Sequence, residues 1–443
     1  MKALPKELIE SLKILPGFKE QDFIESHREE NKITSIRLNP FKKTELDLDL
    51  NDPVKWCAEG FYLSERPSFT HDPLFHAGCY YVQEAGSMFL EFALKSTLDL
   101  SQPLKILDSC ASPGGKSTLI NSLISAESLL VANEIIKSRA DILSYNLSKW
   151  GTCNTIVTNN DPSKFASITG YFDAVVVDAP CSGSGLFRKQ PEAIDEWSVA
   201  NVQLCCGRQQ KILEDILPSL KENGILIYST CSYSIEEDEN IVDFLVKNCE
   251  MEYIPLAVPK EWGIVETQAG YRFYPHLTQS EGFFCAALRK KSSTGTVKQE
   301  KLKETPLNKQ EREILQPFIK TENKFFFRNN GLIHFMNEAA MRFVAQFGKV
   351  LYFKKAGVIS GEIKGKDMVP HHELALSIDF TGENKLNVDI ENALKFLKKQ
   401  NFESHVSGVG FWLISYKNQG LGWAKILPNR INNYLPNELR ILN

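Results

Sequence analysis

The stretch L-K-I-L-D-S-C-A-S-P-G-G-K-S, residues 104–117, decides the fold of the centre of this 443-residue chain. It joins an apolar run, which predicts a β-strand over 104–110, to a turn of small residues and then to a helix that begins at Lys116. Gly114 and Gly115 allow backbone N–H groups to approach a ligand, and the start of a helix favours negative charge. The stretch therefore predicts a nucleotide-binding turn between a strand and a helix.

Strands and helices continue to alternate as far as about residue 290. We predict further strands over 129–134, 154–158, 172–178, 224–229 and 282–288, and helices over 137–150, 192–220 and 236–248. The strands are apolar without interruption, as Val175-Val176-Val177 shows, which is typical of a parallel sheet buried on both faces. We therefore expect an α/β fold with a doubly wound, mostly parallel, Rossmann-like sheet. Ligands of such sheets bind at the carboxyl ends of the strands.

The regions on either side of this core are predicted to form separate modules. We place a small N-terminal accessory domain at 1–95, the core at 96–290, a linker and first C-terminal domain at 291–375, and a second α+β domain at 376–443. From Leu288 onward there are 25 Lys and Arg and 15 Asp and Glu, whereas the rest of the chain has 26 and 40. A basic tail on an acidic body suits an enzyme whose appended domain holds a polyanion, although lysines that only keep a surface soluble give the same count.

The composition excludes several classes of protein. Hydrophobic residues make up 43% and charged residues 24% of the chain, as in soluble globular proteins, and no run of about twenty apolar residues predicts a membrane span. Residues 1–15 mix lysines and glutamates with apolar residues, so they predict an amphipathic helix and no secretory signal. The ten cysteines are scattered without a C-x-x-C pair, which predicts reduced thiols in a cytoplasmic protein and no zinc site.

The small-residue turn nearly spells the phosphate-binding loop of NTPases, because Gly115-Lys116-Ser117 matches the end of that pattern. The apolar strand that ends in Asp178 also resembles the one that holds magnesium in such enzymes. The first glycine of the pattern, however, is replaced by Cys110, whose side chain obstructs a tight cradle around phosphates. An NTPase is therefore the disfavoured alternative.

Three carboxylates at successive strand ends favour a different nucleotide. Glu134 ends the second strand, where such sheets bind ribose hydroxyls, Asp161 follows the third and suits an adenine amino group, and Asp178 ends the fourth. A ring of carboxylates attracts a cationic sulfonium nucleoside and repels a triphosphate. Taken singly, each acid is also compatible with an ordinary helix cap.

Two cysteines also follow strand ends. Cys181 lies in D-A-P-C-S-G-S-G, residues 178–185, and Cys231 lies in Y-S-T-C-S, residues 228–232. If the two strands are adjacent, both thiols reach one cleft. C5 of cytosine is too weak a nucleophile to attack a methyl sulfonium, but a thiolate that adds to C6 makes C5 reactive, and an acid such as Asp178 near N3 stabilises that addition. For either cysteine alone, inert packing is the alternative.

These motifs, in this order and spacing, resemble the Nol/Nop/Sun family of RNA (cytosine-5) methyltransferases. The likeness spans about 75–290 and includes two further segments, Tyr80–Ser87 and Gly282–Phe284. It implies a core that binds S-adenosylmethionine, with Cys231 as the nucleophile and Cys181 as the thiol that helps to release the product. The residues implied to contact S-adenosylmethionine are Cys110, Ala111, Ser112, Pro113, Gly114, Gly115, Lys116, Glu134, Asp161 and Asp178.

Two positions depart from the family pattern. Gly86 stands where the family often has Ser or Ala, and Asp238 stands where Asn is usual. Neither residue belongs to the predicted chemistry. DNA cytosine-5 methyltransferases use the Pro-Cys thiol, here Cys181, as their nucleophile, so the presence of both cysteine motifs favours an RNA enzyme with Cys231 in that role.

The C-terminal sequence narrows the expected substrate. Residues 420–425, G-L-G-W-A-K, and 430–436, R-I-N-N-Y-L-P, resemble the PUA-like module of the bacterial 16S ribosomal RNA methyltransferase F group. Trp423 and Tyr434 either stack on bases or fill a small core. The residues expected to meet phosphates are Lys417, Lys425, Arg430 and Arg440.

The resemblance implies 16S ribosomal RNA or the small ribosomal subunit as the partner. Transfer RNA is the alternative substrate, and a non-catalytic RNA-binding assembly factor is the alternative of another class. We expect a monomer that binds neither a metal nor a membrane.

Overall fold

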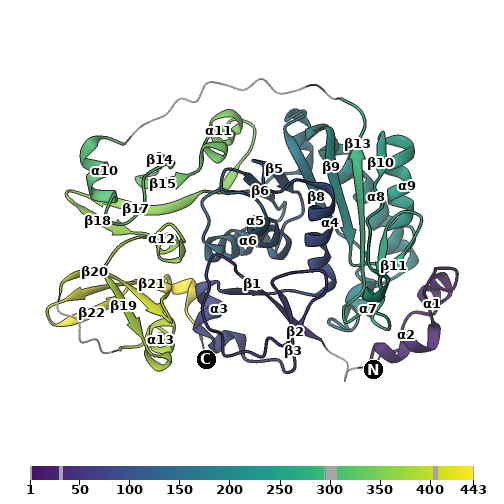
Figure 1. The fold of residues 1–443 in the computed structure, drawn as a ribbon, viewed down its shortest axis with the longest axis horizontal. Coiled ribbons are helices and arrows are strands. Elements are labelled where there is room, and N and C mark those ends of the chain that lie inside the picture. Colours follow the sequence, from purple (N-terminus) through teal and green to yellow (C-terminus); the bar gives the residue numbers. More distant parts are fainter. Residues whose placement is uncertain (1, 29–32, 294, 296–306, 403–407, 443) are drawn as a thin grey trace.

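A ten-stranded sheet forms the centre of the computed structural model, which describes residues 2–28, 33–293, 295, 307–402 and 408–442 (Figure 1). Its strand order is β11-β12-β13-β9-β8-β5-β6-β7-β16, and β10 pairs with β13. The parallel strands are β5 (Lys105–Asp108), β6 (Leu129–Asn133), β7 (Thr155–Thr158), β8 (Phe172–Asp178) and β9 (Leu220–Thr230). The antiparallel strands are β10 (Met251–Tyr253), β11 (Val265–Glu266), β12 (Tyr271–Phe273), β13 (Phe283–Lys290) and β16 (Phe353–Ala356).

The direction in which the chain builds this sheet reverses at β5. From β5 the chain proceeds outward through β6 and β7, and it then returns to place β8 and β9 on the other side of β5. A reversal of this kind leaves a crevice at the carboxyl ends of β5 and β8, which is where doubly wound sheets bind ligands. The predicted Rossmann-like fold is confirmed.

Helices cover both faces of the sheet, which explains why its strands are apolar throughout. Ile106 and Leu130 face a cluster that includes α4 (Leu90–Thr97) and α5 (Gly115–Leu123), with α6 (Lys137–Trp150) packed beside β7. Leu107 and Val131, the next residues along the same strands, face the opposite cluster. The helices of that second layer are α8 (Val199–Ile216), α9 (Glu239–Asn248) and α11 (Glu338–Phe347).

The single helix predicted over 192–220 is wrong in two places. The chain forms a short α7 (Ala193–Glu196) and starts α8 anew after Ser198, whose side chain accepts a hydrogen bond from the backbone N–H of Asn201. At the other end Pro218 cannot continue an α-helix, so a 3-10 turn follows and β9 begins at Leu220. The strand thus starts four residues before the predicted 224.

The N-terminal region forms its own four-stranded antiparallel sheet, in the order β2-β3-β1-β4. Its strands are β1 (Thr34–Leu38), β2 (Asp52–Pro53), β3 (Gly60–Leu63) and β4 (Tyr80–Val82), and its helices are α1 (Lys6–Leu12), α2 (Glu20–Ser26) and α3 (Pro73–Ala77). Helices α1 and α2 pack on Tyr233 and Tyr274 of the core, close to the predicted cysteine motifs. The N-terminal region is therefore joined to the predicted site.

The C-terminal region contains two further four-stranded sheets. The first has the order β14-β15-β17-β18, and its elements are α10 (Lys309–Leu315), β14 (Phe325–Asn329), β15 (Leu332–Met336), β17 (Val358–Lys364), β18 (Asp367–Pro370) and α12 (His372–Leu376). The second has the order β19-β20-β21-β22, and its elements are β19 (Lys385–Val388), α13 (Ile390–Leu397), β20 (Gly410–Tyr416), β21 (Gln419–Leu427) and β22 (Arg430–Asn433). This second sheet shares a core with the N-terminal sheet, because Ile36 and Tyr80 pack with Phe396 and Ile414. Helix α3 of the N-terminal region lies next to β21 and α13 (Figure 1).

Candidate active site

Cys181 and Cys231 lie side by side at the carboxyl edge of the central sheet. Strands β8 and β9 are parallel neighbours with Asp178 opposite Ser229, so the loops that follow them begin at the same level. The two Sγ atoms are 3.0 Å apart, and both residues are half-buried. The sequence expectation that adjacent strand ends bring both thiols into one place is therefore met.

Two glycines allow the cysteine loops to approach so closely. The backbone N–H of Gly185 donates to the carbonyl oxygen of Cys231 at 2.8 Å, and that of Gly282 donates to the carbonyl oxygen of Gly185 at 3.0 Å. A Cβ atom on Gly185 would lie 2.5 Å from the Gly282 oxygen and 2.7 Å from the Cys231 oxygen. The last glycine of the Pro-Cys motif is thus required by a backbone-to-backbone contact.

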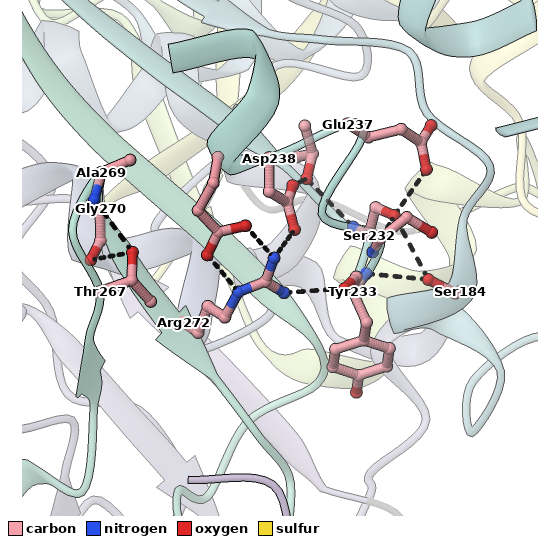
Figure 2. A network of polar contacts seen from close by, with 12 residues as sticks. Ser184, Ser232, Tyr233, Glu237, Asp238, Thr267, Ala269, Gly270 and Arg272 are labelled. Carbon is pink, nitrogen blue, oxygen red and sulfur yellow. Dashed lines mark hydrogen bonds and ion pairs between the residues drawn. The ribbon is translucent and has the colours of Figure 1, made fainter. Parts of the chain in front are cut away.

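A buried carboxylate that the sequence analysis missed connects the two loops. Glu237 accepts hydrogen bonds from the backbone N–H of Ser182 at 2.7 Å, from Ser182 Oγ at 2.5 Å and from Ser232 Oγ at 2.6 Å. Figure 2 shows Glu237 and Ser232 facing one another in this network. Burial is the main cause that raises the pKa of Glu237, and the three donors act against it. Ser232 lies only five residues before Glu237, but Ser182 lies on the other loop, so the bridge forms only in the folded chain.

A second buried network supports the segment after Cys231 (Figure 2). Arg272 of β12 forms an ion pair with Asp238 at 3.1 Å, donates from Nε to Glu239 at 2.6 Å, and donates from Nη1 to the carbonyl oxygen of Tyr233 at 2.8 Å. Asp238 also accepts from Thr230 Oγ1 at 2.6 Å. Asp238, which departs from the family's usual Asn, therefore has a cationic partner in this chain.

The small-residue turn lines a pocket of about 200 Å³, and the wall of this pocket includes Asp178, three residues before Cys181. The predicted cofactor residues on its wall are Cys110, Ala111, Ser112, Pro113, Gly115, Lys116 and Asp178. Gly114 does not line it; its backbone φ of 110° is in the left-handed region and it precedes the first turn of α5. Tyr81, which belongs to the Tyr80–Ser87 segment of the family resemblance, also lines the pocket, as does Lys189, which stands in no motif quoted from the sequence.

Lys116 and Asp178 form an ion pair on the pocket wall, with Nζ 2.7 Å from Oδ2. Burial opposes the charge of Lys116, but the attraction of Asp178 outweighs it and raises the pKa of Lys116. Asp178 also accepts from Ser229 Oγ at 2.8 Å. The lysine that a phosphate-binding loop would direct at a nucleotide is thus paired with a carboxylate, which argues against the NTPase alternative.

The other two predicted acids lie along the same edge but outside this pocket wall. Glu134 is buried just past β6, accepts from the backbone N–H of Ile136 at 2.8 Å and lies 3.6 Å from Nε of Arg139. Asp161 is exposed after β7 and caps a 3-10 turn, accepting from the backbone N–H of Ser163 at 2.9 Å and its Oγ at 2.6 Å. Asp161 therefore makes the contacts of an ordinary cap, which is the alternative role that the sequence allows for a single acid.

Comparisons with known proteins assign the chain to a family. The family model described as 16S rRNA methyltransferase RsmB/F matches residues 95–289, and models of the RsmF N-terminal and PUA domains match 4–85 and 383–441. Ribosomal RNA small subunit methyltransferase F of Aeromonas salmonicida is 30% identical over 429 residues, which is 91% of this chain and 90% of that one. The chain belongs to the RsmB/F family of 16S rRNA methyltransferases.

Other members and a solved structure agree with this RsmB/F assignment. Ribosomal RNA small subunit methyltransferase F of Vibrio cholerae serotype O1 is 30% identical over 479 residues, covering 99% of this chain and 98% of the relative. The crystal structure of a methyltransferase homologue from Pyrococcus horikoshii has a TM-score of 0.52 and 26% identity, and the match covers 65% of this chain and all of that one. The shared part corresponds to a methyltransferase fold.

The RNA-contact residues predicted on the C-terminal module of this RsmB/F member separate into two groups. Trp423 is 1% exposed and donates from Nε1 to the carbonyl oxygen of His371 at 2.8 Å, so it fills a core and cannot stack on a base. Lys417 forms an ion pair with Asp47 at 3.0 Å. The residues that remain exposed are Arg430, Tyr434 and Arg440.

The ten cysteines are all described, and none forms a disulfide. In the part of the chain that the structure describes, no cluster of three or more His, Cys, Asp or Glu side chains is arranged to hold a metal ion. Among the helices of residues 2–28, 33–293, 295, 307–402 and 408–442, none is long and apolar enough to cross a membrane.

Proposed function

We propose that this RsmB/F member transfers a methyl group from S-adenosylmethionine to C5 of a cytosine in 16S rRNA, with Cys231 as a covalent nucleophile. The observation that carries the proposal is the pair of thiols, with Sγ atoms 3.0 Å apart, at the strand ends that also place Asp178 in the wall of the pocket lined by the small-residue turn. A fold of this family can transfer methyl groups to other atoms without a thiol. A thiol nucleophile is needed where a ring carbon must first be made reactive, and the second thiol beside it fits the product-release role that the resemblance implies.

The side chains around the pocket suit S-adenosylmethionine. Asp178 lies on the pocket wall, and buried Asp108 and Glu134 flank the turn. Carboxylates stabilise a sulfonium cation and repel a triphosphate. When bound, S-adenosylmethionine supplies an electrophilic methyl group. The turn from Cys110 to Lys116 and the acids Glu134, Asp161 and Asp178 are proposed to bind it.

The proposed reaction begins with addition of the Cys231 thiolate to C6 of the target cytosine. The new S–C6 bond moves the ring electrons toward C5, which then takes the methyl group. A base removes the proton from C5, the S–C6 bond breaks, and the thiolate of Cys231 is regenerated. The negative charge that the addition places on the cytosine ring is neutralised by a proton taken up at N3, and the carboxylate of Asp178, held beside Lys116, is proposed to accept a hydrogen bond from that N3–H.

The two thiols are close enough to share a hydrogen bond, with Sγ atoms 3.0 Å apart. The hydrogen bond between the thiols, burial, and the nearby charge of Glu237 together raise the pKa of Cys181 well above its usual range. A protonated Cys181 at this separation can donate a hydrogen bond to a thiolate on Cys231. The assignment of Cys231 as the nucleophile and of Cys181 to product release rests on the resemblance of their motifs.

The experiment that tests the proposal follows methyl-labelled S-adenosylmethionine into RNA. Wild type, Cys231→Ala, Cys181→Ala and Cys249→Ala are incubated with 16S rRNA, small ribosomal subunits or tRNA, and the digested RNA is analysed for 5-methylcytosine. Cys249 is a half-buried thiol at the end of α9, away from the site, and serves as the control. We expect 5-methylcytosine with wild type and Cys249→Ala and none with Cys231→Ala. Label in tRNA alone, or no label at all, would contradict the proposed substrate or the proposed reaction.

A further inference from the structure

Each active-site cysteine is followed by a serine, and both serines bond to the same carboxylate. Ser182 follows Cys181 on the loop after β8, and Ser232 follows Cys231 on the loop after β9. Glu237 accepts from the backbone N–H and Oγ of Ser182 and from Oγ of Ser232, at 2.7, 2.5 and 2.6 Å. This carboxylate bridges the two reactive segments, in addition to the contact between the sulfur atoms and the hydrogen bond from Gly185 to the carbonyl oxygen of Cys231.

Burial and contacts with neighbouring side chains hold Glu237 in place. Glu237 has no exposed surface, and its backbone carbonyl accepts from Tyr228 Oη at 2.6 Å. Gln209 of α8 donates from Nε2 to the carbonyl oxygen of Pro180 at 3.1 Å and lies 3.5 Å from Glu237 Oε1. A buried carboxylate is costly unless its oxygens are satisfied, and here neutral donors satisfy them. The bridge is therefore a fixed element of the site.

We propose that Glu237 is a positioning residue that sets the separation and relative orientation of the Cys181 and Cys231 thiols. The effect of Glu237 on catalysis rests on the proposed function. The separation of the two thiols can be measured without any methyl transfer. Glu237 acts through Ser182 and Ser232 and does not touch the cytosine.

The charge of Glu237 has a second consequence. The titratable groups that act on Cys181 are Cys231 and Glu237, and both raise its pKa. Removal of the negative charge at position 237 therefore lowers the pKa of Cys181, whereas a purely structural role would leave the titration of that thiol unchanged.

The first experiment measures the separation of the thiols directly. The protein is treated with diamide, an oxidant of paired thiols, and the Cys181–Cys231 disulfide is quantified over time by peptide mass spectrometry. Sulfur atoms 3.0 Å apart need only a small movement to reach the bonded distance of about 2.05 Å. We expect Glu237→Gln, and a Ser182→Ala/Ser232→Ala double variant, to form this disulfide at least about fivefold more slowly than wild type.

A matched control lies next to Glu237 in the sequence. Glu236 is half-buried and makes none of the three hydrogen bonds to Ser182 and Ser232, so Glu236→Gln should cross-link at the wild-type rate. Thermal melts of all variants identify any that fail to fold, and the serine double variant provides the same test without a change of charge. Equal cross-linking rates in wild type, Glu237→Gln and the double variant would overturn the proposal.

A second experiment separates positioning from simple stabilisation. In a Cys231→Ala background, the pH dependence of Cys181 alkylation by iodoacetamide is compared with and without Glu237→Gln. We expect the midpoint to move to lower pH when the charge is removed. An unchanged midpoint would overturn the electrostatic part of the inference.

The outcomes distinguish this inference from the proposed function. In wild-type background we expect Glu237→Gln to lower kcat for 5-methylcytosine formation at least about tenfold, with KM for S-adenosylmethionine within about twofold. If wild type methylates no RNA but its cross-linking still depends on Glu237, the positioning role stands and the proposed function fails. If wild type methylates and Glu237→Gln matches it in both assays, the function stands and the positioning role fails.

Discussion

Nη2 of Arg37 lies 3.3 Å from the carbonyl oxygen of Gly115, which joins the N-terminal sheet to the first turn of α5. The same group donates to Thr118 Oγ1 at 2.5 Å, and Nε donates to Gln83 at 3.0 Å. The guanidinium is buried, lies over the ring of Trp150, and has its pKa lowered by burial to about 10. The N-terminal region is therefore a structural support of the predicted cofactor turn.

Replacement of Arg37 by Met is expected to weaken binding at this turn. The change removes the donors to α5 and leaves buried acceptors without partners, which costs about 1–3 kcal/mol for each unsatisfied group. We expect a lower melting temperature and at least about tenfold weaker S-adenosylmethionine binding by isothermal titration calorimetry. The affinity and melting temperature of Arg37→Lys should lie between those of wild type and Arg37→Met, because a single ammonium cannot reach all of these acceptors. Wild-type affinity in Arg37→Met would contradict this role.

Two glycines form a matched pair for the contact between the cysteine loops. A Cβ atom at Gly185 would approach two backbone oxygens to 2.5 and 2.7 Å, whereas one at Gly207 in α8 meets nothing within 4 Å. Gly185→Ala should lower the free energy of unfolding by about 2 kcal/mol or more and abolish methylation, because backbone must move. Gly207→Ala should raise stability by about 0.5–1 kcal/mol through helix propensity. Urea unfolding measures the free energy of unfolding of both variants. Equal changes in Gly185→Ala and Gly207→Ala would show that the cysteine loops are not in close contact.

The stability of the chain is expected to carry a pH dependence from Asp108. This carboxyl is fully buried, accepts from Ser117 Oγ at 2.6 Å, and has its pKa raised by burial to about 7. An unfolded Asp has a pKa of about 3.9. Between these values the folded state binds more protons than the unfolded state, so the free energy of unfolding falls as pH rises through this window.

The substitution Asp108→Asn removes that ionisation and isolates its effect. We expect the stability of Asp108→Asn relative to wild type to improve steadily from about pH 4 to pH 7 and to level off above it. Urea titrations at intervals across this range give the difference. A difference that stays constant with pH would show that Asp108 is not the source of the dependence.

Replacement of two aromatic residues of the C-terminal module by Ala is expected to change different properties: stability for one residue and RNA affinity for the other. Trp423 is buried and packs edge-on against Phe380 at 5.2 Å between ring centroids, so Trp423→Ala should cost about 3–5 kcal/mol of stability. Tyr434 is 43% exposed, and Tyr434→Ala should leave the melting temperature nearly unchanged while weakening RNA binding by about 1–3 kcal/mol. Filter binding to 16S rRNA and thermal melts separate the two. Unchanged RNA affinity in Tyr434→Ala would remove this residue from the proposed RNA surface.

Local patterns in the sequence predict the parts of the site that strands and turns place directly. The thiols follow β8 and β9, and the cofactor turn follows β5, so each position follows from a strand end and its neighbour in the sheet. Glu237, Arg272 and Arg37 escape prediction because each has a partner far away in the sequence, such as Ser182 for Glu237, that only tertiary packing brings near. The pairing of β16 with β7 escapes prediction for the same reason, since it joins a C-terminal segment to the core.

Trp423 shows the limit of residue type as a guide. An aromatic residue near basic residues is compatible with base stacking and with a small core, and only its burial distinguishes them. The break before α8 is similar, because the apolar pattern continues through residues 192–220 while Ser198 and Pro218 interrupt the helix.

Cys231 is proposed to form a covalent bond to C6 of the target cytosine. A cytosine with fluorine at C5 cannot release a proton from that carbon after methyl transfer, so the enzyme thiol cannot leave and the adduct is trapped. Wild type is incubated with S-adenosylmethionine and 16S rRNA transcribed with 5-fluorocytidine, digested with nuclease and trypsin, and analysed by mass spectrometry. We expect a nucleotide attached to the peptide that contains Cys231, and none in Cys231→Ala. A nucleotide attached to Cys181, or none in wild type, would contradict it.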